Sequence, residues 1–197
     1  MADEQEKQLI ITEVKKKQIH RVHLDEHIDK PEHYRELSDK LVKATPEEEF
    51  IFIINTSGGY ADTTIQLRNL IMNCRAITTA QIFYAASAGS ILTLSCDRVE
   101  LMEHGSMMIH NPTQMKYGNY KNVKKNVEMY DELFTNMYHK VYKGFLSKNE
   151  IERALSGEEF WFWGDECFKR LERWNRVREK EVETLIKKSK KKDKKNK

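Results

Sequence analysis

Ser87 is the first residue whose setting could do chemistry, because it lies among small residues between a predicted strand and a predicted helix (85–89, AASAG). Small side chains at such a junction let the backbone of a substrate approach closely. A hydroxyl at a helix N-terminus also lies beside unpaired N–H groups and the positive end of the helix dipole. This setting favours an activated serine with a built-in oxyanion donor. A serine that only caps a buried helix would show the same pattern, so both interpretations stay open for this segment.

Two other segments could complete such a site. His110 ends an apolar strand just before a proline turn (107–112, MMIHNP), and it could serve as a general base if its ring faces the serine. A hydrogen-bonded structural histidine would fit the same place. Gly58 and Gly59 follow the most apolar strand (55–59, NTSGG), where paired glycines allow backbone N–H groups to point into a cleft. A glycine turn without a ligand is the alternative.

The elements that must position these residues alternate between strand and helix. Residues 50–54 (FIFII) form a continuous apolar run, typical of a strand covered on both faces. Other strands are predicted at 19–24, 77–84, 99–102 and 107–109, with a turn at His104 and Gly105 between the last two. Helices are predicted at 31–45, 61–72, 91–94, 120–143, 149–155 and 168–186. The apolar positions of the first helix are Tyr34, Leu37, Leu41 and Val42. This alternation implies right-handed βαβ crossovers and a mostly parallel sheet.

The predicted helix at 120–143 is amphipathic and about 36 Å long at 1.5 Å per residue. A helix of that length overhangs a domain of this size, so we expect it to pack against a partner chain in an oligomer. The alternative is that it lies across its own sheet. A helix cap is predicted after it, where Ser147 is followed three residues later by Glu150.

Composition limits the class of protein. The chain has 197 residues, of which 39% are hydrophobic and 33% charged, which is too apolar for a disordered protein and long enough for a sizeable core. No apolar run approaches the roughly 18–20 residues of a membrane span, and residues 1–7 lack the features of a secretory signal. Three scattered cysteines form no CxxC pair, so neither a disulfide framework nor a zinc site is predicted, and a cytoplasmic location is expected.

The lysine-rich end, 187–197, accounts for the positive charge of the chain. It contains eight lysines and one aspartate and so has a charge of +7. Because the whole chain has a net charge of +3, residues 1–186 have a net charge of −4. The body is therefore not a nucleic-acid binder on charge, while the end is predicted to be a disordered solubilising tail or a tether to nucleic acid or an acidic partner. We divide the chain into a flexible arm (1–18), one domain (19–186) and this tail.

In their order along the chain, the motifs NTSGG, AASAG and MIHNP resemble those of the Clp protease proteolytic subunit, a serine peptidase family. That family carries an INSPGG-like turn, a nucleophile motif close to AASMG, and MIHQP around its catalytic histidine. The resemblance extends from about residue 19 to residue 167 and includes the long helix after the histidine and an IER segment at 151–153. It implies an α/β fold of the ClpP/crotonase type, with repeated βαβ units and a long protruding helix.

The resemblance also implies roles for individual residues. Ser87 would be the nucleophile and His110 the general base, with backbone N–H groups of Gly58 or Gly59 and of Ala88 as the oxyanion hole. A peptide carbonyl would acylate the serine, and water would then hydrolyse the acyl-enzyme. No cofactor and no metal are implied.

The third member of the triad depends on how the segment 157–167 is matched to the family. The family has an aspartate shortly before a phenylalanine and an SAEEA-like stretch. Matching residues 165–167 (DEC) to EEA puts Glu159 at the position of the acid, whereas matching Phe160 to the phenylalanine selects Glu158. Either would give a Ser-His-Glu triad. We favour Glu159, with Glu158 as the alternative and an unassisted His110 as the remaining possibility.

As partners, the resemblance implies further copies of the chain in a ring, a heptamer or two stacked heptamers. Unfolded polypeptides would be the substrates, with no membrane partner. A Clp-type ATP-dependent unfoldase would supply them, because no GxxxxGK[ST] motif occurs in this sequence.

Several departures from the family predict a divergent member, of a kind that a phage or virus could encode. Ser57 replaces a proline, the segment 113–119 replaces a glycine-rich one, and the sequence after Cys167 does not match. Three alternatives remain: a phage capsid-maturation protease of the same fold, a catalytically inactive structural subunit, and an acyl-CoA enzyme of the crotonase type.

Overall fold

Within the residues that the structure describes, the sheet has five strands in the order β1-β2-β3-β4-β5. A computed structural model describes residues 17–113 and 117–193. The strands are β1 (Gln18–Leu24), β2 (Glu48–Thr56), β3 (Ile77–Ala86), β4 (Arg98–Ile109) and β5 (Phe160–Trp163). The first four pair in parallel, and β5 pairs antiparallel with β4. The predicted α/β fold with a mostly parallel sheet is therefore confirmed.

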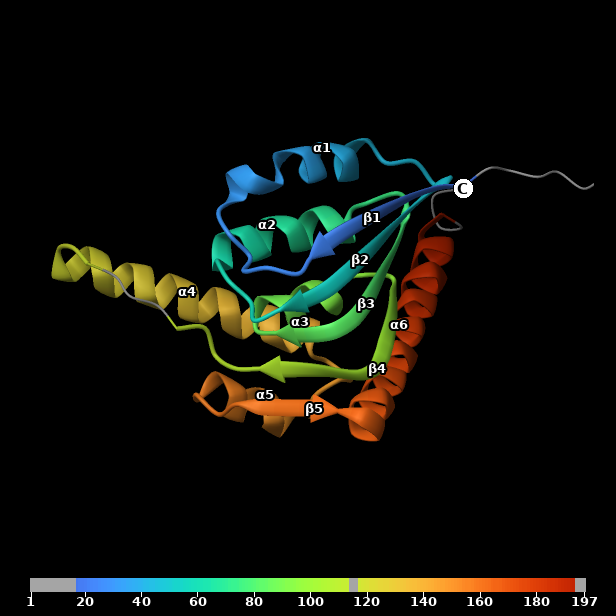
Figure 1. Cartoon of the computed structure of the whole chain (residues 1–197). Helices are drawn as coiled ribbons and strands as arrows, with labels where there is room; N and C mark the ends of the chain where they lie inside the picture. Colours follow the sequence, from blue (N-terminus) through green and yellow to red (C-terminus); the bar gives the residue numbers. More distant parts are fainter. Residues whose placement is uncertain (1–16, 114–116, 194–197) are drawn as a thin grey trace, which may run out of the picture.

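One helix lies in each crossover between neighbouring parallel strands, as right-handed βαβ units require. The helices are α1 (Arg35–Lys43), preceded by a 3-10 turn η1 (Pro31–Tyr34), then α2 (Ala61–Met72), α3 (Ala88–Thr93), α4 (Tyr120–Val141), α5 (Lys148–Leu155) and α6 (Gly164–Asp193). In Figure 1 the parallel strands run toward one side of the molecule, and α4 extends beyond that side. The segment 57–59, Ser87 and His110 each follow one of these strands, so the topology brings them to the same edge of the sheet.

The core is built on one face of β2. Phe50, Phe52 and Ile54 are fully buried, and each such side chain stabilises the fold by about 1.5–3 kcal/mol. The intervening Ile51 and Ile53 are only half-buried. The prediction of a strand covered on both faces is therefore wrong within this chain. Val42, predicted on the apolar face of the first helix, is also exposed.

The two strands predicted between residues 99 and 109 are one continuous strand, β4. The turn residues His104 and Gly105 lie inside it, with His104 at φ 61°. The pairing of β3 with β4 shifts between Ile82 and Tyr84. At this point β4 has more residues than β3, so these residues form a bulge and the strand continues beyond it. A Cβ at Gly105 would lie 2.5 Å from the carbonyl oxygen of Ile82, so the bulge needs glycine there.

Helix α4 has two differently packed halves. Its buried residues all lie in the C-terminal half: Phe134, Met137, Tyr138 and Val141. The N-terminal half leaves Tyr120, Val127 and Met129 exposed, and Figure 1 shows it projecting away from the sheet. The helix thus packs against its own domain at one end and offers an uncovered apolar surface at the other.

The C-terminal region differs from the prediction in two respects. The aromatic segment FWFW forms β5, which was not predicted as a strand. Helix α6 begins at Gly164 and runs to Asp193, into the segment 187–197 for which disorder is predicted. The predicted N-terminal arm, 1–18, lies almost wholly outside the described residues. No helix in the described part of the chain is long and apolar enough to span a membrane.

Candidate active site

Ser87 and His110 meet at the edge of the sheet. The Nε2 atom of His110 lies 2.9 Å from Oγ of Ser87, which is hydrogen-bond distance. Both residues are half-buried, so the pair is open to a ligand. An imidazole at this distance can take the hydroxyl proton as the oxygen attacks an electrophile.

The backbone at Ser87 makes a sharp strand-to-helix turn. The residue precedes α3 with φ 53° and ψ −116°, a conformation that non-glycine residues rarely adopt. Its own N–H donates to the carbonyl of Met108 at 2.9 Å, which continues the β3–β4 pairing up to the turn. A backbone conformation of this kind costs about 1–3 kcal/mol of stability, and it persists where the surrounding contacts hold the residue in place. The turn directs Oγ toward the cleft, in the manner of the nucleophile elbow of α/β-hydrolases.

The glycine turn approaches Ser87 too closely for any side chain. Gly58 has φ 109°, and a Cβ there would lie 2.7 Å from Cβ of Ser87. A Cβ at Gly59 would lie 2.1 Å from the carbonyl oxygen of Ile28. Glycine at both positions therefore lets this loop fit between the serine turn and the segment after β1.

The amides of this region are not equally available. The N–H of Gly58 donates to Oγ1 of Thr56 at 3.1 Å, so the prediction of Gly58 as an oxyanion donor does not fit the geometry. The N–H groups of Gly59 and Ala88 donate to no other group within residues 17–113 and 117–193. Thr56 was not singled out from sequence, because only the folded loop shows that its hydroxyl oxygen accepts the hydrogen bond of the Gly58 amide.

Two tyrosines support the site: Tyr138 on α4, and Tyr142, the residue that caps the C-terminal end of this helix. Tyr138 donates its hydroxyl to the carbonyl oxygen of His110. The hydroxyls of Tyr142 and Ser90 lie 2.7 Å apart, and Ser90 donates in turn to the carbonyl of Ser87 at 2.7 Å. Burial raises the pKa of both tyrosines well above the ordinary value, which keeps them neutral donors. The sequence marked these tyrosines only as members of an apolar stripe.

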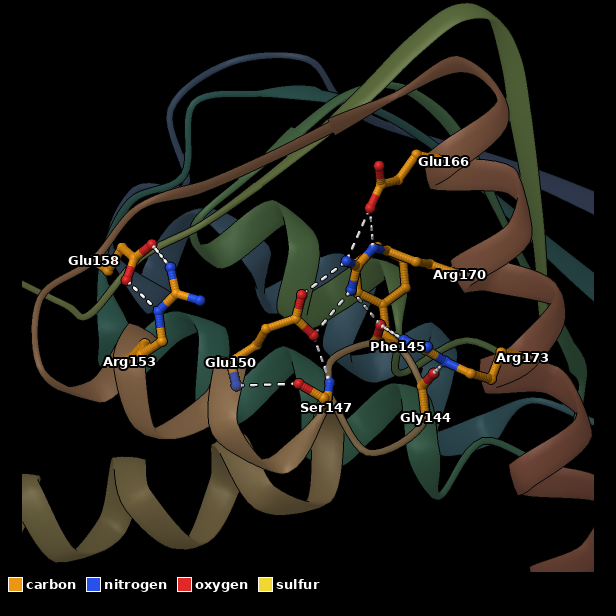
Figure 2. Close-up of polar contacts among 9 residues, drawn as sticks. All are labelled: Gly144, Phe145, Ser147, Glu150, Arg153, Glu158, Glu166, Arg170 and Arg173. Atoms are coloured by element: carbon orange, nitrogen blue, oxygen red, sulfur yellow. Dashed lines mark hydrogen bonds and ion pairs between the residues drawn. The ribbon is translucent and has the colours of Figure 1, made fainter.

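The predicted acids do not reach His110 in the described part of the chain. Glu158 is exposed and forms an ion pair with Arg153, through Nε at 2.6 Å and through NH2 (Figure 2). Glu159 is also exposed, and it precedes β5. The antiparallel register pairs Ile109 with Phe160, so Glu159 and His110 are the next residues beyond the last pair of the ladder.

An ion-pair network fixes the segment that carries these glutamates. Arg170 on α6 donates to Glu150 at 2.8 Å and lies 2.9 Å from Glu166 (Figure 2). Its guanidinium also lies 4.2 Å from the ring centre of Phe162 on β5. Glu150 completes the predicted capping box with Ser147, which is confirmed. Hydrogen bonds from Arg170 lower the pKa of Glu150 to about 2.

A cleft of about 500 Å³ opens in front of the serine and histidine. Its lining includes residues 57–62, Ser87, His110, His27 and Tyr130. Among the described residues, no group of three or more His, Cys, Asp or Glu side chains is placed to hold a metal ion. The hydroxyl of Ser87, the imidazole of His110 and the amides beside them are groups that nucleophilic attack can use.

Comparison with known proteins agrees with this geometry. No curated protein matches the sequence. The sequence does match the Clp protease family over residues 4–169, which includes Ser87, His110, the glycine turn and both candidate glutamates and ends in the first turns of α6. Since the match covers most of the chain, the resemblance carried by the three motifs is confirmed, and this protein belongs to the Clp protease family of peptidases.

Proposed function

We propose that this chain is a serine endopeptidase that forms an acyl-enzyme on Ser87, with His110 as the general base. The observation that carries the proposal is the 2.9 Å contact between Nε2 of the histidine and Oγ of the serine at the mouth of the cleft. In the first half-reaction, Oγ attacks the peptide carbonyl carbon while the imidazole takes its proton, and the imidazolium then protonates the departing amine. In the second, His110 deprotonates a water that attacks the ester and returns the proton to Oγ.

The negative charge of the tetrahedral intermediate would be held by the amides of Gly59 and Ala88. Both are open in the described structure and flank the serine turn. Ala88 also begins α3, so its N–H is one of the unpaired donors of a helix N-terminus. An oxyanion donor of this kind contributes about 3–4 kcal/mol to the transition state.

As the acid that orients His110 we propose Glu159. Two observations support Glu159 over Glu158. Continued by one residue, the β4–β5 register would set Glu159 opposite His110, and the carboxylate of Glu158 is bound to Arg153. With its exposed side chain rotated toward the histidine, Glu159 would accept a hydrogen bond from the Nδ1–H group of His110. Glu158 remains the alternative, and its carboxylate would first have to break the ion pair with Arg153.

The proposed assembly is a homo-oligomeric ring of seven copies, or two such rings stacked. The exposed apolar residues on the projecting half of α4 support a contact between copies. In a closed chamber the substrates would be unfolded polypeptides, delivered by an ATP-dependent unfoldase in the cytoplasm. The mass of the protein in solution tests the ring, and co-purification with an ATPase tests the unfoldase.

A catalytically inactive structural subunit is the second candidate. The observation that favours it is the lack of any contact between either glutamate and His110 within the described residues. A phage capsid-maturation protease would share the chemistry but need no unfoldase.

Labelling with a fluorophosphonate and hydrolysis of short fluorogenic peptides separate these functions. The unaltered protein should react with both, while Ser87→Ala should lose all labelling and His110→Ala should slow labelling at least a thousandfold. Labelling that persists in Ser87→Ala would exclude Ser87 as the nucleophile. A protein that neither labels nor cleaves as an assembled oligomer would be the structural subunit.

A further inference from the structure

The catalytic cleft contains one carboxylate that the proposed mechanism does not use. Asp62 lines the same cleft as Ser87 and His110, and it is the only acidic residue in that lining among the residues that the structure describes. We propose that Asp62 is a specificity-determining residue that binds the cationic side chain of a lysine or arginine in the peptide substrate. This inference rests on the proposed peptidase function and names its substrate class.

The position of Asp62 holds its carboxylate at the cleft. Asp62 lies in the first turn of α2, three residues after Gly59, where the positive end of the helix dipole favours a negative charge. Tyr130 on α4 donates its hydroxyl to Oδ1 of Asp62 at 2.7 Å. That hydrogen bond raises the pKa of Tyr130, as expected for a donor facing a carboxylate. The carboxylate is thus fixed between two helices.

The second oxygen of this carboxylate is available to a ligand. Asp62 is exposed, and it forms no ion pair with any residue in the ranges 17–113 and 117–193. An aspartate that faces a cleft with one oxygen fixed and the other open can accept a charge-assisted hydrogen bond from an ammonium or guanidinium group.

The rest of the cleft wall suits the stem of such a side chain. Tyr60 is half exposed and lies against His27 in an edge-to-face contact with ring centres 5.9 Å apart. Tyr130 provides a further aromatic surface in the lining. Lysine and arginine pack their methylene stems on apolar surfaces and place their cations near aromatic rings. An acidic substrate side chain would instead meet the charge of Asp62.

A cation in a peptide can come from a side chain or from the free N-terminus, and one substrate series distinguishes the two. The whole chain, as assembled in solution, is given peptides that differ only by lysine or norleucine at each position before the scissile bond. Each peptide is supplied N-acetylated and with a free amine. We expect one position at which lysine raises kcat/KM about tenfold over norleucine, the lower range for a hydrogen bond to a charged group. The preference should persist after acetylation and weaken at high salt.

The variants are chosen from the contacts of Asp62. Asp62→Asn should bring the ratio of kcat/KM for the lysine peptide to kcat/KM for the norleucine peptide close to one. Asp62→Lys should make the protein prefer a peptide with glutamate at that position over one with lysine. Tyr130→Phe should reduce the ratio in part. Asp165→Asn is the matched control, because Asp165 is also an exposed aspartate in the first turn of a helix but does not line this cleft, so its ratio should equal that of the unaltered protein.

Each outcome separates this inference from the proposed function. Equal cleavage of both peptides, or a lysine preference that survives Asp62→Asn, would overturn the role of Asp62 and leave the peptidase intact. A preference that disappears on acetylation would assign the carboxylate to the N-terminal amine and overturn the side-chain proposal. A protein that cleaves neither peptide and takes no fluorophosphonate would overturn both.

Discussion

Tyr138 donates its hydroxyl to the backbone carbonyl of His110, so the histidine that faces Ser87 is held from α4 as well as from β4. Removing the Tyr138 hydroxyl should displace the imidazole of His110 without removing any contact between the protein and a substrate. We expect Tyr138→Phe to lower kcat between about tenfold and a hundredfold with little change in KM, because a small displacement of a catalytic group costs this much in rate.

Kinetics of peptide hydrolysis check this expectation. Tyr120→Phe is the control, since Tyr120 is an exposed tyrosine at the far end of the same helix. A Tyr138→Phe variant with unchanged kcat but a lower free energy of unfolding would show that the bond only stabilises the fold.

The identity of the acid can be decided by two neutral substitutions. Glu159→Gln should lower kcat by about a thousandfold or more, as loss of the orienting acid does in other serine hydrolases. Glu158→Gln should affect only its exposed ion pair with Arg153, and solvent screening keeps the contribution of such a pair to stability small. If Glu158→Gln loses activity while Glu159→Gln retains it, the assignments are reversed.

Glu150 should make the stability of the fold depend on pH in the acid range. Its pKa is lowered to about 2 in the folded protein from the ordinary 4.5, chiefly by the hydrogen bond from Arg170. The unfolded chain therefore binds the proton more tightly. The stabilisation is complete above pH 4.5 and is lost as the pH falls toward 2.

Urea unfolding of Glu150→Gln measures this contribution. At pH 7 we expect the free energy of unfolding to fall by about 2 kcal/mol, the value of a hydrogen bond to a charged group, and the difference should shrink at pH 3. Glu172→Gln on the exposed face of α6 should show neither effect. A loss that is the same at both pH values would mean that packing, and not charge, is responsible.

Gly58 should tolerate no side chain. In Gly58→Ala the new Cβ would lie 2.7 Å from Cβ of Ser87, so the turn or the serine must move, and the fluorophosphonate labelling rate should fall at least tenfold.

Gly157→Ala is the matched control for backbone strain. Gly157 has a similar φ of 103°, but a Cβ there would meet nothing within 4 Å. Both variants should lose about 1 kcal/mol of stability from the positive φ, whereas only Gly58→Ala should lose labelling. Equal labelling rates in the two variants would contradict the close approach of the glycine turn to the serine.

The meeting of Ser87 and His110 could be predicted from sequence, because the residues that come directly after parallel strands lie at one edge of the sheet. The α/β alternation accounts for this shared edge, while the pairing of the two side chains was implied by the resemblance to the Clp protease family. The continuity of β4 could not be predicted, since His104 and Gly105 have the composition of a turn and only the β3 register shows that they form a bulge.

Other parts of the site depend on contacts between distant segments. The occupied amide of Gly58 is visible only when the hydroxyl of Thr56 is placed beside it. Tyr138 and Asp62 lie outside the three motifs, and their spacing within helices is explained equally well by packing. The length of α6 was underestimated because a lysine-rich end has the composition of a solvated tail, although lysine is itself a good helix former.

One consequence of α4 concerns how distant events could alter the chemistry. Tyr138 on α4 bonds to the carbonyl of His110, and Tyr142, which caps the C-terminal end of α4, contacts Ser90, which in turn bonds to the carbonyl of Ser87. A tilt of the uncovered tip of α4 would therefore displace both reacting groups at once. Contact with a neighbouring molecule at that tip would change the turnover rate and, because Tyr130 on the same helix holds Asp62, would also move the wall of the cleft.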